Sequence, residues 1–502
     1  MKEQQEAGTL DARQRRAPIP EAMRAYAGDG ALAFHTPGHK QGLGAHPLLR
    51  RLITAEGLRE EVSLMEELDD LHEPTMCIKE AEELAAALYG ADHAYLMVNG
   101  TTGAIHAMLV GALAPGDVVL VPRNAHRSLI GGLVLAGAVP VYLQPEFDAA
   151  YGIPMGVAPE TVARAIEAHP EARAAALVYP TYYGVTTDLA AIAHLLHAHD
   201  MLLLVDEAHG AHLRFSGALP PQAIDCGADA AAQSTHKLLG AMTQGSLLLT
   251  RGARLDEERV REAASLLQTT SPNQLLMASI DIARLQMAEE GRARVGRAVR
   301  LAQMVRRAVN GIPGLASFGA EAMTRPGMSG LDLTKVTVRV RGLGLTGVAA
   351  EQILRHTYRV QCELSDAENL LFIISYADTE REAERLIEAL RDLARTHAGG
   401  AGGEAQELRE ARALPPVPET ACAPRTAFFA AKERVPFDAA AGRIAAEQVM
   451  FYPPGVPLLA PGDRVTAAAI DYIRAMQRAG RKVIGPEDPQ LRTLKVLREE
   501  RS

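Results

Sequence analysis

The 502-residue chain lacks tryptophan and has only four cysteines, Cys77, Cys226, Cys362 and Cys422. Because no two of them form a Cys-x-x-Cys pair, the sequence predicts neither a disulfide framework nor a zinc knuckle. No apolar run approaches the roughly 18 residues of a membrane span, and the N-terminus has no apolar signal segment. The chain also lacks a basic block, and its net charge of −9 argues against nucleic acid as the main partner. We therefore expect a globular cytoplasmic protein that acts on a small molecule and binds neither membrane nor nucleic acid.

Lysine is scarce as well, with eight lysines against 44 arginines. One of them, Lys237, stands among small and apolar residues in "STHKLLGAMTQGS" (234–246). A lysine kept in such a setting indicates that an amine is needed there. Schiff-base chemistry requires a lysine that is desolvated, so that its amine can lose a proton.

Apolar and amphipathic segments alternate between residues 79 and 250, as in βαβ units, and this pattern predicts an α/β fold. Continuous Val/Leu runs such as "DVVLVP" (117–122) and "MLLLVDEA" (201–208) are typical of strands covered on both faces, in a parallel or mostly parallel sheet. Further along, a long helical region over 255–308 and mixed patterns after it predict additional domains. We divide the chain into an N-terminal arm (1–78), a large α/β domain (79–310), a small α+β domain (311–396), a Gly/Ala-rich linker (397–407) and a C-terminal α+β domain (408–502).

Ligands of open α/β sheets bind beyond the carboxyl ends of the strands, where this chain has "NGTTG", "RNAHRS", "PTYYG" and "DEAHG". Gly100, Thr101 and Thr102 lie between a predicted strand and a helix, where backbone N–H groups and hydroxyls make a phosphate cradle. An ordinary helix N-cap is the alternative. The chain contains no Gly-Lys pair, so it has no P-loop, and the helicase-like string "DEAH" is accidental.

Asp206 stands at the end of a buried strand, where a carboxylate can hold the protonated ring nitrogen of pyridoxal phosphate (PLP). For an isolated aspartate, a helix cap or a structural ion pair is the favoured interpretation, but here Lys237 follows 31 residues later. His126 ends another strand and can stack on a planar ring, or it is an ordinary loop histidine. Ser234 and His236 can donate hydrogen bonds to a phosphate, or they can stabilise the turn in which they lie.

A zinc site built from His209 and His212 is the remaining interpretation. Their His-x-x-His spacing has no carboxylate at metalloprotease spacing, so we expect no metal.

The order of phosphate loop, histidine, strand-end aspartate and Ser-x-His-Lys resembles the fold-type I (aspartate aminotransferase-like) PLP enzymes. More narrowly, the chain is similar to the ornithine/lysine/arginine decarboxylase family over about residues 30–485. The segments that carry the resemblance are "FHTPGHKQG" (34–42), "LDDLHEPTMCIKEAEELAAALYGADHAYLMVNGTTGAIHAM" (68–108), "STHKLLGAMTQGS" (234–246), "RTAFFAAKE" (425–433) and "YPPGVPLLAPGD" (452–463).

The resemblance implies roles for single residues. Lys237 would form the Schiff base, Asp206 would meet the pyridine nitrogen and His126 would stack on the ring. Residues implied to hold the phosphate are Gly100, Thr101, Thr102, Ser234 and His236. His209 is expected near the ring or its O3′ oxygen, and Glu447 near the distal amine of the substrate.

The implied activity is PLP-dependent decarboxylation of a basic amino acid in polyamine biosynthesis, with arginine expected before lysine and ornithine. An aminotransferase, a non-catalytic PLP-binding homologue and a metal hydrolase remain alternatives. Only about thirty residues precede "FHTPGHK", which resembles the short form found in many Gram-positive bacteria, without the N-terminal wing domain of ring-forming members. We expect a homodimer or a higher oligomer with active sites at the subunit interface, where Ser271 would complete the neighbour's phosphate site.

Overall fold

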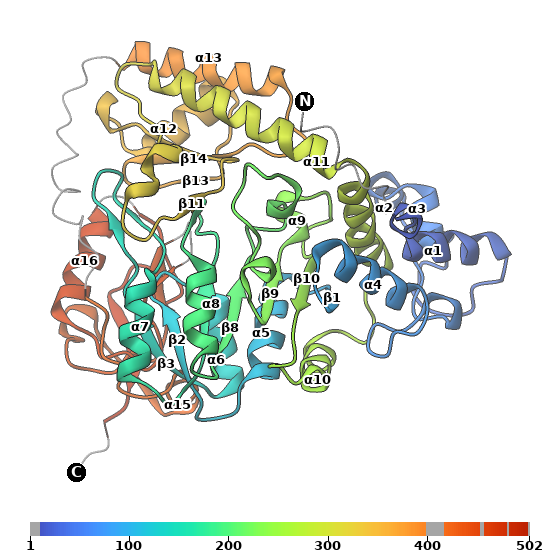
Figure 1. Ribbon diagram of the computed structural model, residues 1–502, viewed down its shortest axis with the longest axis horizontal. Helices are drawn as coiled ribbons and strands as arrows, with labels where there is room; N and C mark the ends of the chain where they lie inside the picture. The colour runs from blue at the N-terminus through green and yellow to red at the C-terminus, as the bar shows by residue number, and fades with distance from the viewer. Residues whose placement is uncertain (1–10, 398–415, 452–455, 479–480, 500–502) are drawn as a thin grey trace. The chain divides into compact units, whose positions relative to one another are not determined.

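The computed structural model describes residues 11–397, 416–451, 456–478 and 481–499 (Figure 1). Nearly all of the predicted linker (397–407) and part of the Pro-dense segment (452–455) lie outside the described residues. The chain divides into two compact units. The first contains the described parts of residues 1–112, 206–216 and 222–294, and the second contains those of residues 113–205, 217–221 and 295–502.

Three buried strands of the first unit run antiparallel in the order β1–β10–β9. β1 (His93–Met97) pairs with β10 (Ser246–Thr250), and β10 pairs with β9 (Ala230–Gln233). Leu247 of β10 lies opposite Gln233 of β9. This register brings the beginning of β10 beside the end of β9, immediately before the segment that contains Lys237.

Helices precede and follow β1 in the first unit. α4 (Cys77–Tyr89) ends at Gly90, which has a left-handed φ of 69° that favours glycine. α5 (Gly100–Ala112) packs against α10 (Glu257–Leu267). The approach is close at Gly111, where a Cβ atom would lie 2.8 Å from the Cα of Val260.

The helical region predicted over 255–308 contains two helices. α10 ends at Leu267 and α11 (Gln274–Asn310) begins seven residues later. Pro272 lies in the interruption, and proline supplies no backbone N–H to a helix interior and disfavours helical geometry in the residue before it.

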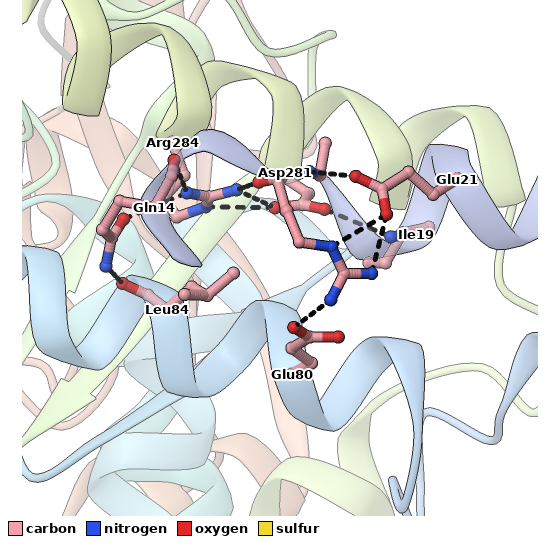
Figure 2. Close-up of polar contacts among 9 residues, drawn as sticks. Gln14, Ile19, Glu21, Glu80, Leu84, Asp281 and Arg284 are labelled. Atoms are coloured by element: carbon pink, nitrogen blue, oxygen red, sulfur yellow. Dashed lines mark hydrogen bonds and ion pairs between the residues drawn. The ribbon is translucent and has the colours of Figure 1, made fainter. Parts of the chain in front are cut away.

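A buried arginine of α11 holds the N-terminal segment of the first unit (Figure 2). The Arg284 guanidinium donates to the side chain of Asp281 at 2.8 Å and to the side chain of Gln14 at 3.0 Å. It also donates to the carbonyl of Arg16. The other carboxylate oxygen of Asp281 accepts from the N–H of Ile19 at 3.2 Å. Arg284 and Asp281 have almost no exposed side-chain surface, so the network joins segments far apart in the sequence through buried charges.

The second unit contains the parallel strands, in the order β8–β6–β2–β3. β2 (Val118–Pro122) pairs in parallel with both β3 (Val139–Leu143) and β6 (Ala172–Val178). β8 (Leu202–Asp206) is buried along its whole length. Helices alternate with these strands, as βαβ units require: α6 (Arg127–Ala136), α7 (Pro159–Ala168) and α8 (Leu189–His197) (Figure 1). The α/β prediction with a mostly parallel sheet is confirmed.

An α+β substructure follows within the second unit. β14 (Asn369–Ile373) pairs in antiparallel fashion with β12 (Lys335–Arg339) and β13 (Leu364–Ser365). Its core joins the strands to the last turns of α11 and to α13 (Glu380–Thr396), which lie beside each other in Figure 1. Buried members of this core include Val305, Val309, Val336, Val338, Leu370, Leu390 and Leu393.

The C-terminal part of the second unit has a separate buried core. Its strands form two small antiparallel sheets. They are β15 (Lys432–Pro436) with β19 (Thr493–Leu497), and β16 (Val449–Phe451) with β17 (Val456–Leu459) and β18 (Val483–Ile484). The helix α16 (Ala467–Arg478) contributes to this core, in which its Ile473 packs with Phe437 and Leu494.

Two further observations concern the whole described chain. All four cysteines are free thiols, and Cys77, Cys226 and Cys362 are buried. Among the described helices, none combines the length and the apolar surface needed to cross a bilayer.

Candidate active site

Lys237 lies on a single helical turn, α9 (Thr235–Leu238), directly after β9 and Ser234. Its Nζ is 3.2 Å from the Nε2 of His209. The lysine side chain is exposed, so the prediction of a desolvated Lys237 is wrong for this structure. The reason is helical phase: Thr235 and Leu238 are three residues apart and both buried, which turns Lys237 toward the outside of the turn.

Asp206 and His209 come from the turn that follows β8. Asp206 is 5% exposed, and its Oδ1 accepts a hydrogen bond from the N–H of Ala208 at 3.1 Å. The N–H of Gly210 donates to the carbonyl of Glu207 at 2.8 Å, which closes the turn. The turn brings the 6% exposed imidazole of His209 to Lys237. The structure thus joins Lys237 directly to His209 and places His209 three residues beyond the buried acid.

Hydroxyl groups from three segments meet at the beginning of α5. The Oγ1 of Thr101 contacts the hydroxyl of Ser234 and lies 2.9 Å from that of Ser246. The Ser246 hydroxyl donates to the carbonyl of Gln233 at 2.6 Å. Two predicted residues, Thr101 and Ser234, are therefore together in one buried cluster. Ser246 was not predicted, because only the pairing of β10 with β9 reveals its position.

Gly100 begins α5 in a left-handed conformation with a φ of 67°. A Cβ atom there would meet nothing within 4 Å, so the backbone borders open space at the positive end of a 13-residue helix. The Gly100 N–H donates to the carbonyl of Gln244 at 2.9 Å. Gly100 therefore allows a ligand to approach the backbone closely. Thr102, two residues further along, is exposed.

His236 is half-buried beside Lys237. Its Nδ1 lies 2.8 Å from the carbonyl oxygen of Gly245, to which it donates. Burial lowers the pKa of His236, and the charge of Lys237 lowers it further. A neutral ring held in this way presents Nε2 as an acceptor, so donation from Nε2 to a phosphate requires the protonated ring.

His126 and Glu447 belong to the second unit. His126 is the N-cap of α6, where its Nδ1 accepts from the N–H of Ser128 at 3.3 Å. Glu447 accepts the N–H of Glu487 with one carboxylate oxygen, at 2.8 Å, and the N–H of Lys495 with the other, at 2.7 Å. Their roles near the cofactor and the substrate stay predictions.

The donor set of the first unit fits a phosphorylated aldehyde cofactor. The Oγ1 of Thr235 is buried and has no hydrogen-bond partner in the described chain, so a donor is available beside the hydroxyl cluster. Gly100 provides open space for a phosphate, Lys237 provides an amine and Asp206 provides a buried carboxylate. Within the described residues, no group of three or more His, Cys, Asp or Glu side chains is arranged to hold a metal ion.

Comparisons with known proteins identify the class and then the family. The α/β fold is that of the fold-type I PLP enzymes: a solved lysine decarboxylase from Francisella novicida aligns with a TM-score of 0.86 and 22% identity, covering 97% of this chain and 82% of the other. Residues 17–382 match the Orn/Lys/Arg decarboxylase major domain, and residues 407–488 match the C-terminal domain of the same family. The chain belongs to the Orn/Lys/Arg decarboxylase family, and it is a PLP-dependent decarboxylase.

Two relatives match almost the full length of the chain. The arginine decarboxylase of Halalkalibacterium halodurans is 42% identical over 487 residues, which cover 97% of this chain and 99% of that protein. The arginine decarboxylase of Bacillus subtilis is 40% identical over 489 residues, with the same coverage. The predictions of family, enzyme class and cofactor are confirmed.

Proposed function

We propose that this protein decarboxylates L-arginine to agmatine in the cytoplasm, as a step of polyamine biosynthesis. The observation that carries the proposal is the contact between Lys237 and His209, next to a buried Asp206 and a buried hydroxyl cluster, in a chain with two full-length relatives named arginine decarboxylase. Lysine and ornithine are the alternative substrates, because the name of the family includes all three amino acids.

The cofactor-binding residues have distinct tasks. Lys237 supplies the amine that attaches PLP, and Asp206 supplies the negative charge for the ring nitrogen. The hydroxyls of Thr101 and Ser234, with Gly100, Thr102 and His236, would hold the phosphate of PLP. His126 would stack on its ring. When bound, PLP supplies an electron sink that accepts the electron pair left on the α-carbon when the carboxylate departs as CO2.

The proton that replaces the carboxylate at the α-carbon comes from the pair formed by Lys237 and His209. The 3.2 Å separation of their nitrogens allows one proton to be held between an amine and an imidazole. His209 thereby controls the protonation state of Lys237, whose side chain is exposed.

Glu447 is the residue assigned to bind the distal group of the substrate. Its carboxylate oxygens each accept one backbone N–H, and every carboxylate oxygen has a second lone pair for a guanidinium or ammonium donor. The protein is proposed to act as a homodimer or a larger homo-oligomer, with Ser271 of a second copy completing the phosphate site. Ser271 is exposed in the single chain, as such a role requires.

Replacing Lys237 by alanine tests the cofactor assignment. We expect the wild-type protein with PLP to show the absorbance of the lysine-bound cofactor near the visible edge and to release CO2 from arginine. Lys237→Ala should show neither. Formation of a keto acid without CO2 would identify an aminotransferase, and an unchanged spectrum in Lys237→Ala would contradict the role of this lysine.

A further inference from the structure

Glu207 is a fully buried carboxyl group that no assigned role explains. It directly follows Asp206 and has 0% exposed surface. Its Oε1 accepts the N–H of Ala223 at 2.7 Å, and its Oε2 accepts the side-chain Nε2 of Gln233 at 2.8 Å. Its own N–H donates to the carbonyl of Ala232 at 3.0 Å. Both the backbone and the side chain of Glu207 are therefore bound to the end of β9.

Gln233 connects this carboxyl group to the hydroxyl cluster. It is the last residue of β9, has 0% exposed surface and immediately precedes Ser234. Its carbonyl accepts the hydroxyl of Ser246, which lies 2.9 Å from the Oγ1 of Thr101. A continuous series of buried polar contacts thus runs from the neighbour of Asp206 to the residues at the beginning of α5.

The surroundings of Glu207 leave it little freedom. A Cβ atom on Gly210 would lie 2.4 Å from the Cγ of Glu207, so only glycine allows the turn to close over this side chain. Burial, with a smaller contribution from the charge of Asp225, raises the pKa of Glu207 to about 8, although the hydrogen bonds from Gln233 and the Ala223 N–H lower it. Among the described residues, Asp225 acts electrostatically on Glu207, and Glu207 acts on the buried hydroxyl of Tyr89, which Arg214 and Arg284 also influence.

The raised pKa has an electrostatic consequence for the site. At neutral pH the side chain of Glu207 is mostly protonated. The carboxyl group of Glu207 then holds the turn by hydrogen bonds without adding a negative charge beside Asp206.

We infer that Glu207, through its hydrogen bond to Gln233, is a positioning residue that fixes the Asp206–His209 turn against the segment containing Ser234 and Lys237. The inference rests on the proposed function, since these two segments carry the acid, the amine and part of the phosphate site. Glu207 does not touch the substrate or the cofactor in this account. It sets the spacing between groups that do.

The test compares Glu207→Leu with Glu207→Gln in the full-length protein. Leucine removes both side-chain hydrogen bonds. Glutamine retains them, because its amide oxygen accepts from the Ala223 N–H and its amide nitrogen donates to the amide oxygen of Gln233 after the Gln233 amide group rotates by half a turn. Glu82→Leu is the matched control. Glu82 lies in the same unit, is 7% exposed, has a pKa raised by burial to about 8 and accepts the N–H of Leu96 at 3.1 Å.

Four quantities should be measured: the dissociation constant of PLP, the midpoint of the pH titration of the bound cofactor's absorbance, and kcat and KM for CO2 release. For Glu207→Leu we expect PLP to bind about 10-fold more weakly or worse, the midpoint to shift by about half a pH unit or more, and kcat to fall more than KM changes. Glu207→Gln should stay within about threefold of wild type in PLP binding. Glu82→Leu should lose stability without moving the midpoint.

The inference would be overturned if Glu207→Leu had the same titration midpoint and the same PLP affinity as the wild type. It would also be overturned if Glu82→Leu shifted both quantities as much as Glu207→Leu does. If Glu207→Leu does not fold, Gln233→Leu removes the same hydrogen bond from the other side, and the same expectations apply. Failure of the wild-type protein to bind PLP or to release CO2 would instead refute the proposed function, so the two failures are distinguishable.

Discussion

The Nζ of Lys237 lies 3.2 Å from the Nε2 of His209, although the two residues come from different turns of the chain. The contact gives His209 a direct influence on the protonation of the lysine. We expect His209→Asn to lower kcat about 100-fold with little change in KM, because a positioned acid–base group contributes about 10²–10⁴-fold. Steady-state CO2 release measures both constants.

His212→Asn is the control for that substitution. His212 is also buried and lies three residues beyond His209, at the beginning of the next short helix. It should retain kcat within about threefold. Equal effects of the two substitutions would show that His209 acts only through the folding of this segment.

The hydroxyl cluster should control cofactor affinity. Thr101→Val removes the hydroxyl that contacts Ser234 and Ser246 while keeping the shape of the side chain. A hydrogen bond to a charged group is worth about 1.5–3 kcal/mol, so PLP should bind about 10- to 100-fold more weakly. Thr250→Val removes a buried hydroxyl of β10 that instead bonds Glu257 at 2.9 Å, and it should leave PLP affinity unchanged. Titration of the apo-protein with PLP distinguishes the two outcomes.

The buried pair of Arg284 and Asp281 should contribute strongly to stability. Arg284→Met leaves Asp281 buried without its cation, and removing one member of a buried pair costs about 3–5 kcal/mol. Arg294→Met, on the same helix, breaks a partly exposed pair with Glu290 and should cost less than about 1 kcal/mol. Urea unfolding measures both free energies. A loss below about 1 kcal/mol for Arg284→Met would contradict the importance of the network in Figure 2.

Stability should depend on pH through Glu207. Burial raises the pKa of this side chain from the ordinary 4.5 to about 8. At a pH between these two pKa values, the folded chain therefore keeps a proton that the unfolded chain has lost. The free energy of unfolding consequently decreases as the pH rises through this range. Relative to Glu207→Gln, the free energy of unfolding of the wild type should fall between about pH 5 and about pH 8. Parallel pH dependence in the two proteins would contradict the assignment.

Much of the fold could be predicted from the order of apolar runs. The Val/Leu runs of β2 and β8 are confirmed as strands, since strands buried on both faces carry few polar residues. The interruption between α10 and α11 could have been found from Pro272. By contrast, the antiparallel pairing of β10 depends on long-range register, which a single sequence does not encode in any local pattern.

The residues of the site also fall into those that the sequence could predict and those that it could not. Lys237, Asp206 and Thr101 could be found because each follows a strand or precedes a helix, where sheets of this type bind ligands. Ser246 and Gln233 could not, because their positions follow from the pairing of β9 with β10. Glu207 was hidden within "DEAH", since burial rather than spacing distinguishes it. The exposure of Lys237 follows from the phase of a four-residue helix, whose exact beginning no pattern predicts.

Release of CO2 from L-arginine, L-lysine and L-ornithine by the PLP-loaded protein, with Lys237→Ala in parallel, tests the proposed arginine decarboxylase activity. We expect kcat/KM for arginine to exceed that for the other two by about 10-fold or more, a difference of about 1.4 kcal/mol, and Lys237→Ala to release no CO2. A preference for lysine or ornithine would contradict the substrate assignment. CO2 release that persists in Lys237→Ala would contradict the account as a whole.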